Sequence, residues 1–319
     1  MRSSHITGLL CAALLSLFAA TASAQPAAPA TQAPSTPAHF ANGGPETCLK
    51  CHNDAKVNPI LQTPHATKGD PHAPFGQMGC ESCHGAAGDH VESRANKPSV
   101  LFKGPNKSPA AARNEMCLTC HQNGLRMNWQ GSQHANQDMA CNDCHQVHVR
   151  KDPVLIKMSQ AEKCFTCHAE QRSQVFRFSH HPIREGKVTC SDCHNPHGSP
   201  GPKLLKEVTV NETCYNCHAE KRGPLAWEHE PVRENCLTCH TPHGSNQPRL
   251  LVQRPPYLCQ ECHSNSSHQS NPQSGQQLPG KTGFNGAIST NFRSFARGCV
   301  NCHSQIHGSN SPAGMWFTR

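Results

Sequence analysis

The chain has 319 residues with 21 Cys and 24 His, but hydrophobic residues make up only 35% of it and aromatic residues 5%. This composition excludes an ordinary globular enzyme of this length, which would bury a large aliphatic and aromatic core. The 26 Pro and 23 Gly also predict few long regular elements. We therefore expect cysteine and histidine chemistry, rather than aliphatic packing, to hold the fold together.

Residues 1–24 are typical of a secretory signal peptide. Arg2 supplies a basic start, residues 6–20 form an apolar run, and residues 22–24 (Ala-Ser-Ala) have the small side chains of a cleavage site. The alternative is an uncleaved membrane anchor, but the run is shorter than the roughly 20 apolar residues that a span needs. Cys11 lies inside the run and is expected to be removed with it. We therefore expect the mature chain to be exported.

The other 20 cysteines all fall into ten copies of the sequence C-x-x-C-H. These cysteines are Cys48, Cys51, Cys80, Cys83, Cys117, Cys120, Cys141, Cys144, Cys164, Cys167, Cys190, Cys193, Cys214, Cys217, Cys236, Cys239, Cys259, Cys262, Cys299 and Cys302. The histidines that close the motifs are His52, His84, His121, His145, His168, His194, His218, His240, His263 and His303. The motif is the attachment signal of haem c, in which both thiols bind the porphyrin and the histidine is the proximal iron ligand. The sequence therefore predicts ten covalently bound haem c groups.

Paired cysteines in an exported protein can also form disulfides, zinc sites or thioredoxin-like redox pairs. None of these alternatives requires a histidine directly after the second cysteine, and here it follows in every copy. Haem also accounts for the small supply of apolar residues, because the porphyrins would supply the core.

Thirteen histidines lie outside the motifs and the predicted signal peptide, and ten haems need at most ten distal ligands. Four histidines closely follow a motif, four precede one, and two complete the set. The predicted distal ligands are His65, His90, His134, His148, His181, His197, His229, His243, His268 and His307. His39, His72 and His180 are predicted to be surface residues, although His180 remains the alternative to its neighbour His181. A histidine three residues past a proximal ligand, such as His197, can hardly reach the opposite face of the same iron. We therefore expect it to serve a neighbouring haem.

The motifs alternate in type: those that begin at Cys48, Cys117, Cys164, Cys214 and Cys259 have no histidine three or four residues on, whereas the other five are mostly flanked by spare histidines on both sides. The chain therefore divides into five haem-pair repeats, with similar central units at residues 194–199 (H-N-P-H-G-S) and 240–245 (H-T-P-H-G-S). Units this small cannot form independent cores, so the haems must pack against one another. We predict one elongated cytochrome domain over residues 47–319, mostly irregular with short α-helices and no significant β-sheet.

Two helices are predicted from possible capping residues. Residues 159–162 (S-Q-A-E) have the pattern of a capping box, which predicts a helix to about Phe176. Asn211 is a candidate cap for a helix that Gly223-Pro224 would end.

Two segments contain no motif. Residues 25–46 are rich in Pro and Ala and are predicted to form a flexible tail. Residues 264–298 are rich in Ser, Asn, Gln and Gly, and are interpreted as a surface loop or, alternatively, as a segment that a partner orders. The formal charge of +8 does not indicate a nucleic-acid partner, because the propionates of attached haems would pair with many of the basic residues.

The motifs and their surroundings resemble the decahaem cytochromes of porin–cytochrome conduits, the MtrA, MtoA, PioA and DmsE family. The resemblance covers most of the mature chain and is clearest in residues 141–149 (CNDCHQVHV), 190–199 (CSDCHNPHGS), 219–224 (AEKRGP) and 301–309 (NCHSQIHGS). It implies bis-His ligation of all ten haems by the ten distal histidines given above, with His181 aligning better than His180.

The resemblance also implies a periplasmic location with attachment to the outer membrane, inside a β-barrel porin. The electron partners of the protein would be periplasmic or inner-membrane c-type cytochromes on the periplasmic side of the outer membrane. On the other side they would be an extracellular multihaem cytochrome, or Fe(II) or Fe(III) directly. The Pro/Ala-rich tail departs from the pattern of the family's reducing members, so the resemblance assigns it no role.

Three functions can be compared on these grounds. An electron conduit is favoured because two imidazoles on each iron leave no position for a substrate. A haem enzyme that converts nitrite or hydroxylamine needs a five-coordinate haem and often a lysine in place of the motif histidine, and C-x-x-C-Lys does not occur. A porin-free periplasmic electron shuttle has the same ligands as a conduit. The resemblance is closer to the MtoA type, which favours Fe(II) oxidation over the reduction of metals or dimethyl sulfoxide, although ligand counting does not distinguish them.

Overall fold

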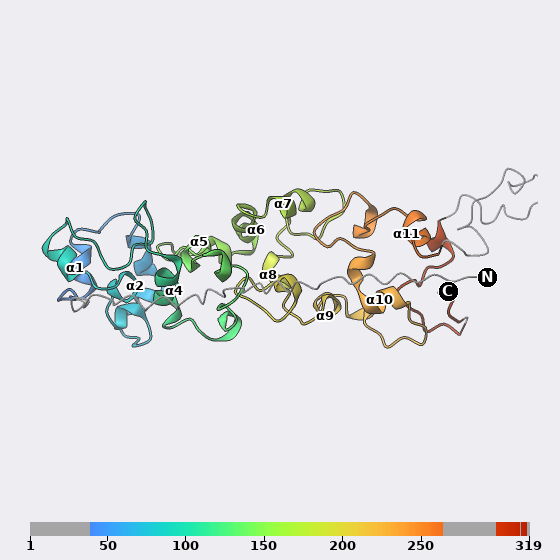
Figure 1. Ribbon diagram of the computed structural model, residues 1–319, viewed down its shortest axis with the longest axis horizontal. Coiled ribbons are helices and arrows are strands. Elements are labelled where there is room, and N and C mark those ends of the chain that lie inside the picture. The colour runs from blue at the N-terminus through green and yellow to red at the C-terminus, as the bar shows by residue number, and fades with distance from the viewer. Residues whose placement is uncertain (1–38, 264–297, 313, 318–319) are drawn as a thin grey trace, which may run out of the picture. The chain divides into compact units, whose positions relative to one another are not determined.

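The computed structural model describes residues 39–263, 298–312 and 314–317 (Figure 1). The chain divides into two units, residues 1–38 and 39–319, and all described residues belong to the second. The predicted signal peptide, most of the predicted tail and nearly all of residues 264–298 lie outside the described part. Residues 39–46 lie within it, so the described body begins before the predicted boundary at residue 47.

Regular structure in the described residues is helical and short (Figure 1). The α-helices are α1 (Pro45–Leu49), α2 (Glu81–His84), α3 (Gly88–Glu92), α4 (Ala110–Leu118), α5 (Cys141–Cys144), α6 (Lys157–Phe165), α7 (Ala169–Val175), α8 (Cys190–Cys193), α9 (Val210–Tyr215), α10 (Glu230–Glu234) and α11 (Tyr257–Gln260). The 3-10 helices are η1 (Asn58–Gln62), η2 (Pro64–Ala66), η3 (Pro74–Gly76), η4 (Gly124–Arg126), η5 (Ala135–Gln137), η6 (Pro153–Leu155), η7 (Pro202–Leu204), η8 (Ala219–Lys221), η9 (Cys236–Thr238), η10 (Pro248–Leu250) and η13 (Cys299–Asn301). The described part contains no β-strand, only isolated bridges such as Ser179–Ser245 and Trp227–Ser309. The predicted class, a mostly irregular chain with short helices and no significant sheet, is confirmed. None of the described helices combines the length and the apolar character that a membrane crossing requires.

Each C-x-x-C-H motif forms one helical turn. In all ten copies the histidine N–H donates to the carbonyl of the first cysteine, with N–O distances of 2.8–3.1 Å. Residues three and four apart lie on the same face of a helix. The turn therefore presents both thiols and the imidazole on one side of the backbone.

Buried amide side chains join the two motifs of a repeat. Asn114 of α4 accepts a hydrogen bond from Cys141 N (2.8 Å) and donates to Met139 O (3.0 Å). Asn211 of α9 accepts from Cys236 N (2.8 Å) and donates to the carbonyls of Val232 and Arg233. Both amides are 7% exposed, so these bonds replace water at the start of the second motif. Their equivalence supports the division into haem-pair repeats.

The two predicted helix caps are wrong in detail. Ser159 lies inside α6, where its hydroxyl donates to Pro153 O, and α6 begins after Ile156 instead. The helical segment also breaks at the fifth motif, between α6 and α7. Thr209 caps α9 by accepting from Glu212 N, because the Asn211 side chain is occupied in the contacts with Val232, Arg233 and Cys236.

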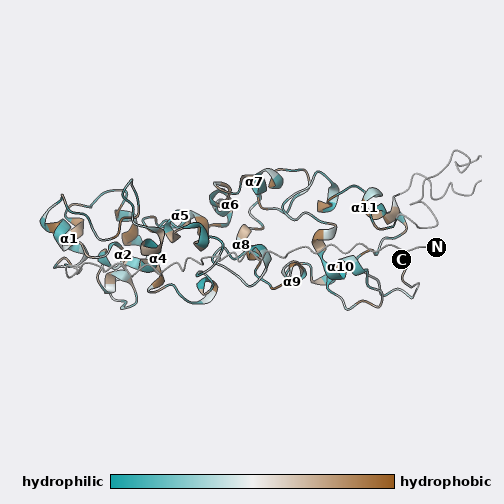
Figure 2. Ribbon diagram, in the orientation of Figure 1, coloured by the Kyte–Doolittle hydropathy of each residue, from teal (hydrophilic) through white to brown (hydrophobic). Residues whose placement is uncertain are grey.

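Few large apolar side chains are buried in the described residues. The buried hydrophobic residues are Ala73, Phe75, Ala87, Val100, Trp129, Ala140 and Val175. Figure 2 shows hydrophobic positions scattered among hydrophilic ones along the helices and loops. Several large apolar side chains remain exposed, including Met127, Leu155 and Phe178. The polypeptide alone therefore supplies little of a core, as the composition predicts.

Candidate haem centres

Nine motif histidines lie opposite one of the predicted distal histidines. Their ring centroids are 6.0–6.3 Å apart in the pairs His52–His90, His121–His65, His84–His148, His168–His134, His145–His197, His218–His181, His194–His243, His263–His229 and His240–His307. A metal–nitrogen bond to an imidazole is about 2.0–2.1 Å long, and the ring centroid lies roughly 1.1 Å beyond the bound nitrogen. Two imidazoles on opposite sides of one metal ion therefore have centroids roughly 6.3 Å apart. The spacing therefore fits one iron between each pair of rings.

The tenth centre is described on one side only. His303 belongs to the last motif, and its Nδ1 lies 2.6 Å from Trp316 O. His268, the histidine predicted to oppose it, lies outside the described residues. That assignment stays a prediction.

Each histidine that closely follows a motif lies opposite the histidine of an earlier motif, two motifs before its own in the chain. His148 lies opposite His84, His197 opposite His145, His243 opposite His194, and His307 opposite His240. None of them faces the motif histidine three or four residues before it, as the spacing predicts. The partner belongs to the preceding repeat rather than to the adjacent motif, so these contacts join one repeat to the next.

Close backbone approaches hold these histidines in place. The Nδ1 atoms of His134, His181 and His229 lie 2.6–3.0 Å from the carbonyls just before the distal histidines, on Pro196, Pro242 and Ile306. Each such contact connects the predicted distal histidines of two neighbouring histidine pairs.

The glycine after His197 permits a close contact with the backbone of Asn128. A Cβ at Gly198 would lie 2.1 Å from Asn128 O, and its φ is +106°. Gly308, after His307, has a φ of +128°, and a Cβ there would lie 2.2 Å from Leu225 Cδ1. Both positions therefore favour glycine on steric and conformational grounds.

The motif cysteines follow one another through space in chain order. None of these twenty cysteines forms a disulfide. First cysteines of the two motifs in a repeat interact electrostatically in the pairs Cys48–Cys80, Cys117–Cys141, Cys164–Cys190, Cys214–Cys236 and Cys259–Cys299. Second cysteines interact from one repeat to the next in the pairs Cys83–Cys120, Cys144–Cys167, Cys193–Cys217 and Cys239–Cys262. The ten motifs therefore form one continuous series.

Burial favours the neutral form of eight of the paired imidazoles. Desolvation is the main cause of a lowered pKa for His84, His121, His148, His197, His229, His240, His243 and His307. For His197 the pKa falls to about 4. An imidazole binds a metal through the lone pair of its neutral form, so this environment suits iron ligation.

Several paired histidines have Nδ1 bonded to a backbone carbonyl, which fixes the tautomer that presents Nε2 to a metal. Examples are His90 to Asn96 O, His194 to Lys203 O and His240 to Arg249 O, at 2.8–3.0 Å. His145 is bonded instead to a carboxylate oxygen of Asp152, at 2.6 Å. Asp152 is not predictable from the motif, because nothing in C-x-x-C-H marks a residue seven positions after the histidine.

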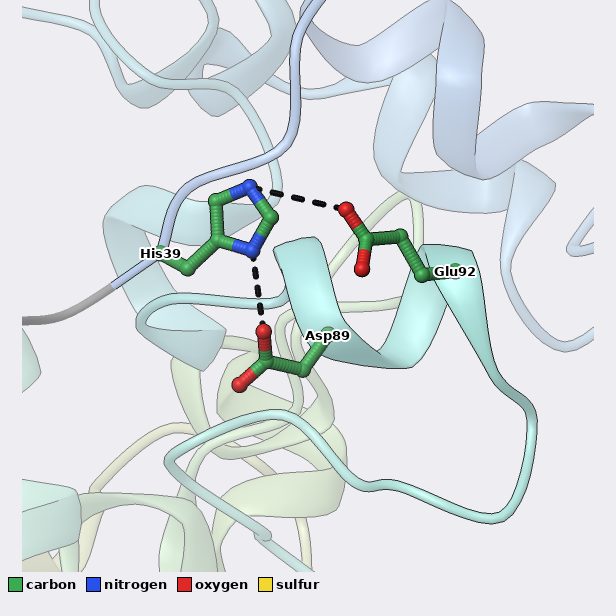
Figure 3. Close-up of side chains that lie close together, drawn as sticks. All are labelled: His39, Asp89 and Glu92. Carbon is green, nitrogen blue, oxygen red and sulfur yellow. Dashed lines mark hydrogen bonds and ion pairs between the residues drawn. The ribbon is translucent and has the colours of Figure 1, made fainter. Parts of the chain in front are cut away.

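The three histidines predicted to be surface residues pair with no motif histidine in the described part. His39 is exposed and lies between two carboxylates, with Nδ1 2.9 Å from Asp89 and Nε2 3.8 Å from Glu92 (Figure 3). The hydrogen bond to Asp89 is the main cause of a raised pKa for His39. A protonated imidazole offers no lone pair, so we interpret this cluster as an ion pair rather than a metal site.

The other two differ in exposure. His72 is exposed, as predicted. His180 is half-buried rather than on the surface, because it contacts Arg177 O and Glu185. His181 is the member of that pair that lies opposite a motif histidine.

Comparisons with known proteins agree with the interpretation of the motifs as haem attachment sites. The doubled CXXCH motif family matches residues 180–223 and 229–268, the cytochrome c-type protein NrfB-like family matches residues 80–159, and the cytochrome c554 and c-prime family matches residues 18–85. The multiheme cytochrome MtrA of Shewanella baltica (strain OS185) is 45% identical over 282 residues, which are 88% of this chain and 83% of that protein. The motifs are therefore sites of covalent haem c attachment.

Proposed function

Because the chain belongs to the family of the multihaem c-type cytochrome MtrA, we propose that it carries ten haem c groups and conducts electrons along them across the outer membrane. Both cysteines of each motif would hold one porphyrin. The haem iron supplies one-electron redox chemistry when bound. The polypeptide supplies the ligands, their hydrogen bonds and their order along the chain.

We assign two histidines to each iron. In motif order the pairs are His52 and His90, His84 and His148, His121 and His65, His145 and His197, His168 and His134, His194 and His243, His218 and His181, His240 and His307, His263 and His229, and His303 and His268. Ring spacing supports the first nine pairs. Only counting supports the tenth.

The observation that carries the proposal is that a second imidazole lies opposite the motif histidine at nine of the ten motifs. Two strong nitrogen ligands leave an iron no open position for a substrate, which favours electron transfer over substrate turnover. Because the same ligands suit both oxidation states, little rearrangement would accompany each electron. Any redox activity toward external metal ions would then be outer-sphere.

The order of the motifs supports a continuous path. The thiols of consecutive motifs lie close enough for one to raise the pKa of the other, alternately through first and second cysteines. Haems attached to neighbouring thiols would lie close together, as electron tunnelling between them requires. A storage protein would not need such an uninterrupted series.

We further propose a periplasmic protein held at the outer membrane inside a β-barrel porin. It would exchange electrons with periplasmic or inner-membrane c-type cytochromes. On the outer side it would exchange them with Fe(II) or Fe(III), or with an extracellular multihaem cytochrome. For direction we propose the oxidation of external Fe(II), as expected from the resemblance to the MtoA type.

Reconstitution tests the conduit directly. The holoprotein and its porin are inserted together in vesicles that contain an oxidised redox dye, and Fe(II) is added outside. Dye reduction that requires both proteins supports the conduit and the inward direction. Vesicles that contain a reduced dye, with Fe(III) added outside, measure the outward direction.

Each alternative has its own outcome. Equal dye reduction with and without the porin contradicts the conduit. Failure of the cytochrome to co-purify with any outer-membrane barrel supports the periplasmic shuttle instead. A high-spin haem in the oxidised wild-type protein would indicate an open iron position and favour an enzyme.

A further inference from the structure

The fourth motif has a hydrogen bond that differs from those of the equivalent motifs. His145 Nδ1 lies 2.6 Å from a carboxylate oxygen of Asp152. At the equivalent centres of later repeats, His194 and His240 bond to backbone carbonyls. The next candidate is Glu220, which is 3.8 Å from His218 Nδ1 and 60% exposed. Among the described paired histidines, His145 alone has a carboxylate within hydrogen-bonding distance of Nδ1.

The local sequence explains the difference. Helices η6, η7 and η10 each begin with a proline eight residues after the motif histidine. In η7 and η10 the next residues, Lys203 and Arg249, have φ values of 52° and 62°, and their carbonyls accept the imidazole hydrogen bond. In η6 the equivalent residue, Val154, avoids the left-handed region and donates its N–H to Asp152. The aspartate therefore both caps η6 and replaces the missing carbonyl as acceptor.

The carboxylate of Asp152 is held in place and poorly solvated. It is 11% exposed, and its second oxygen accepts from the N–H groups of Gln146 and Val154, both at 3.3 Å. Within the described residues its only ion-pair partner is His145, so neither Lys nor Arg lies within 4 Å to offset its charge. Its hydrogen bond to His145 is therefore stronger than one to a carbonyl.

The opposite side of this centre provides no counterpart. His197 Nδ1 is buried and has no hydrogen-bond partner. Hydrogen bonding to the imidazoles of this centre therefore comes from the Asp152 side alone.

These features have one chemical consequence. A carboxylate acceptor makes the imidazole a stronger electron donor through Nε2, and a stronger donor stabilises the oxidised iron. We propose that Asp152 is a positioning residue that gives the haem of the fourth motif a lower reduction potential than the same haem would have with a neutral acceptor. This inference rests on the proposed ligand pair His145–His197, but it does not depend on a porin or on the direction of electron flow.

The test is a redox titration of the full-length, fully haem-loaded protein, followed by electron paramagnetic resonance. In Asp152→Asn the acceptor remains but the charge is removed. We expect one haem to become easier to reduce, with about a tenfold change in its oxidised-to-reduced ratio at a fixed potential, which is ~59 mV for one electron. The other nine should not change.

Matched variants identify the cause. Asp152→Glu keeps a carboxylate and should keep most of the low potential. Asp152→Gln places a neutral amide where the equivalent residue of the later repeat is Gln247, and it should reproduce the shift if Asp152→Asn folds poorly. Glu220→Gln removes the exposed carboxylate near His218 and should shift no haem.

A second substitution identifies the haem. His197→Met should give the fourth haem a distinct spectrum, and adding Asp152→Asn should then move the potential of that marked haem.

Unchanged potentials in both neutral variants would overturn the proposal. Loss of the low-spin signal in Asp152→Asn would also overturn it, because any change in potential would then come from the loss of an axial ligand rather than from the loss of the carboxylate charge. A shifted potential without conduction in vesicles would leave this inference standing and contradict the proposed conduit.

Discussion

The imidazole rings of His145 and His197 lie nearly parallel, with centroids 6.0 Å apart and 11° between their planes, although they belong to motif units of different repeats. His197 reaches this position because residues around it contact the segment that precedes the fourth motif. Pro196 O lies 2.8 Å from His134 Nδ1, and Asn195 donates to Leu125 O at 2.8 Å. The pair therefore depends on docking between repeats rather than on local spacing.

Two double substitutions test this pairing. In His145→Met/His197→Met both changes fall on one centre, so we expect one bis-His haem to be lost. In His194→Met/His197→Met they fall on two centres, so two should be lost. Electron paramagnetic resonance counts the remaining bis-His haems.

Mass spectrometry must show ten haems in every variant, so that failed attachment is not counted as a ligand change. His197→Met alone should alter one haem. The reverse result, with two haems lost in the first double variant and one in the second, would mean that His197 serves the haem of its own motif.

Substitution of Gly198 tests the docking. Gly198→Ala adds a Cβ 2.1 Å from Asn128 O at a φ of +106°, so the backbone must shift. Gly131→Ala is the matched control, because Gly131 has a φ of +78° but no atom within 4 Å of the added Cβ. Both variants bear the cost of a left-handed alanine, and only Gly198→Ala should lose about 1–3 kcal/mol more from overpacking.

Denaturant titration and the high-spin fraction measure this difference. We expect Gly198→Ala to be less stable than Gly131→Ala and to show one partly high-spin haem. Equal stabilities with fully low-spin haems would mean that the close approach at Gly198 does not hold His197.

The sequence predicts the set of candidate ligands better than their partners. Ten distal histidines were predicted by matching the number of spare histidines to the number of haems, and nine of them lie opposite a motif histidine. It could not predict that His197 faces His145, because that contact arises from docking of distant segments. Asp152 was missed for a related reason: its role depends on the backbone conformation of Val154, which no motif encodes. The predicted start of a helix was wrong where the expected capping side chain instead bonds to a distant segment, as that of Asn211 does.

The buried amide of Asn211 should contribute measurably to stability. Asn211→Ala leaves Cys236 N and the carbonyls of Val232 and Arg233 without their partner in a site that is 7% exposed. Leaving buried polar groups unpaired costs about 1–3 kcal/mol, so the denaturation midpoint should fall. Asn216→Ala, in which an exposed amide loses a hydrogen bond to Glu207, should change it little. Equal midpoints for the two variants would contradict a structural role for Asn211.

The ion pair of His39 should make the attachment of residues 39–41 depend on pH. Because the pKa of His39 is raised above 6.5, its stabilising effect is complete below pH 6.5 and is lost as the pH rises through the higher folded value. Gly88 N–H donates to His39 O at 2.8 Å, so its exchange with deuterium reports on this contact. After correction for intrinsic exchange, protection of Gly88 should fall over that range. His39→Gln should abolish the pH dependence, whereas His72→Gln, at an exposed histidine, should retain it. A profile that is the same in wild type and His39→Gln would show that the backbone contacts alone hold this segment.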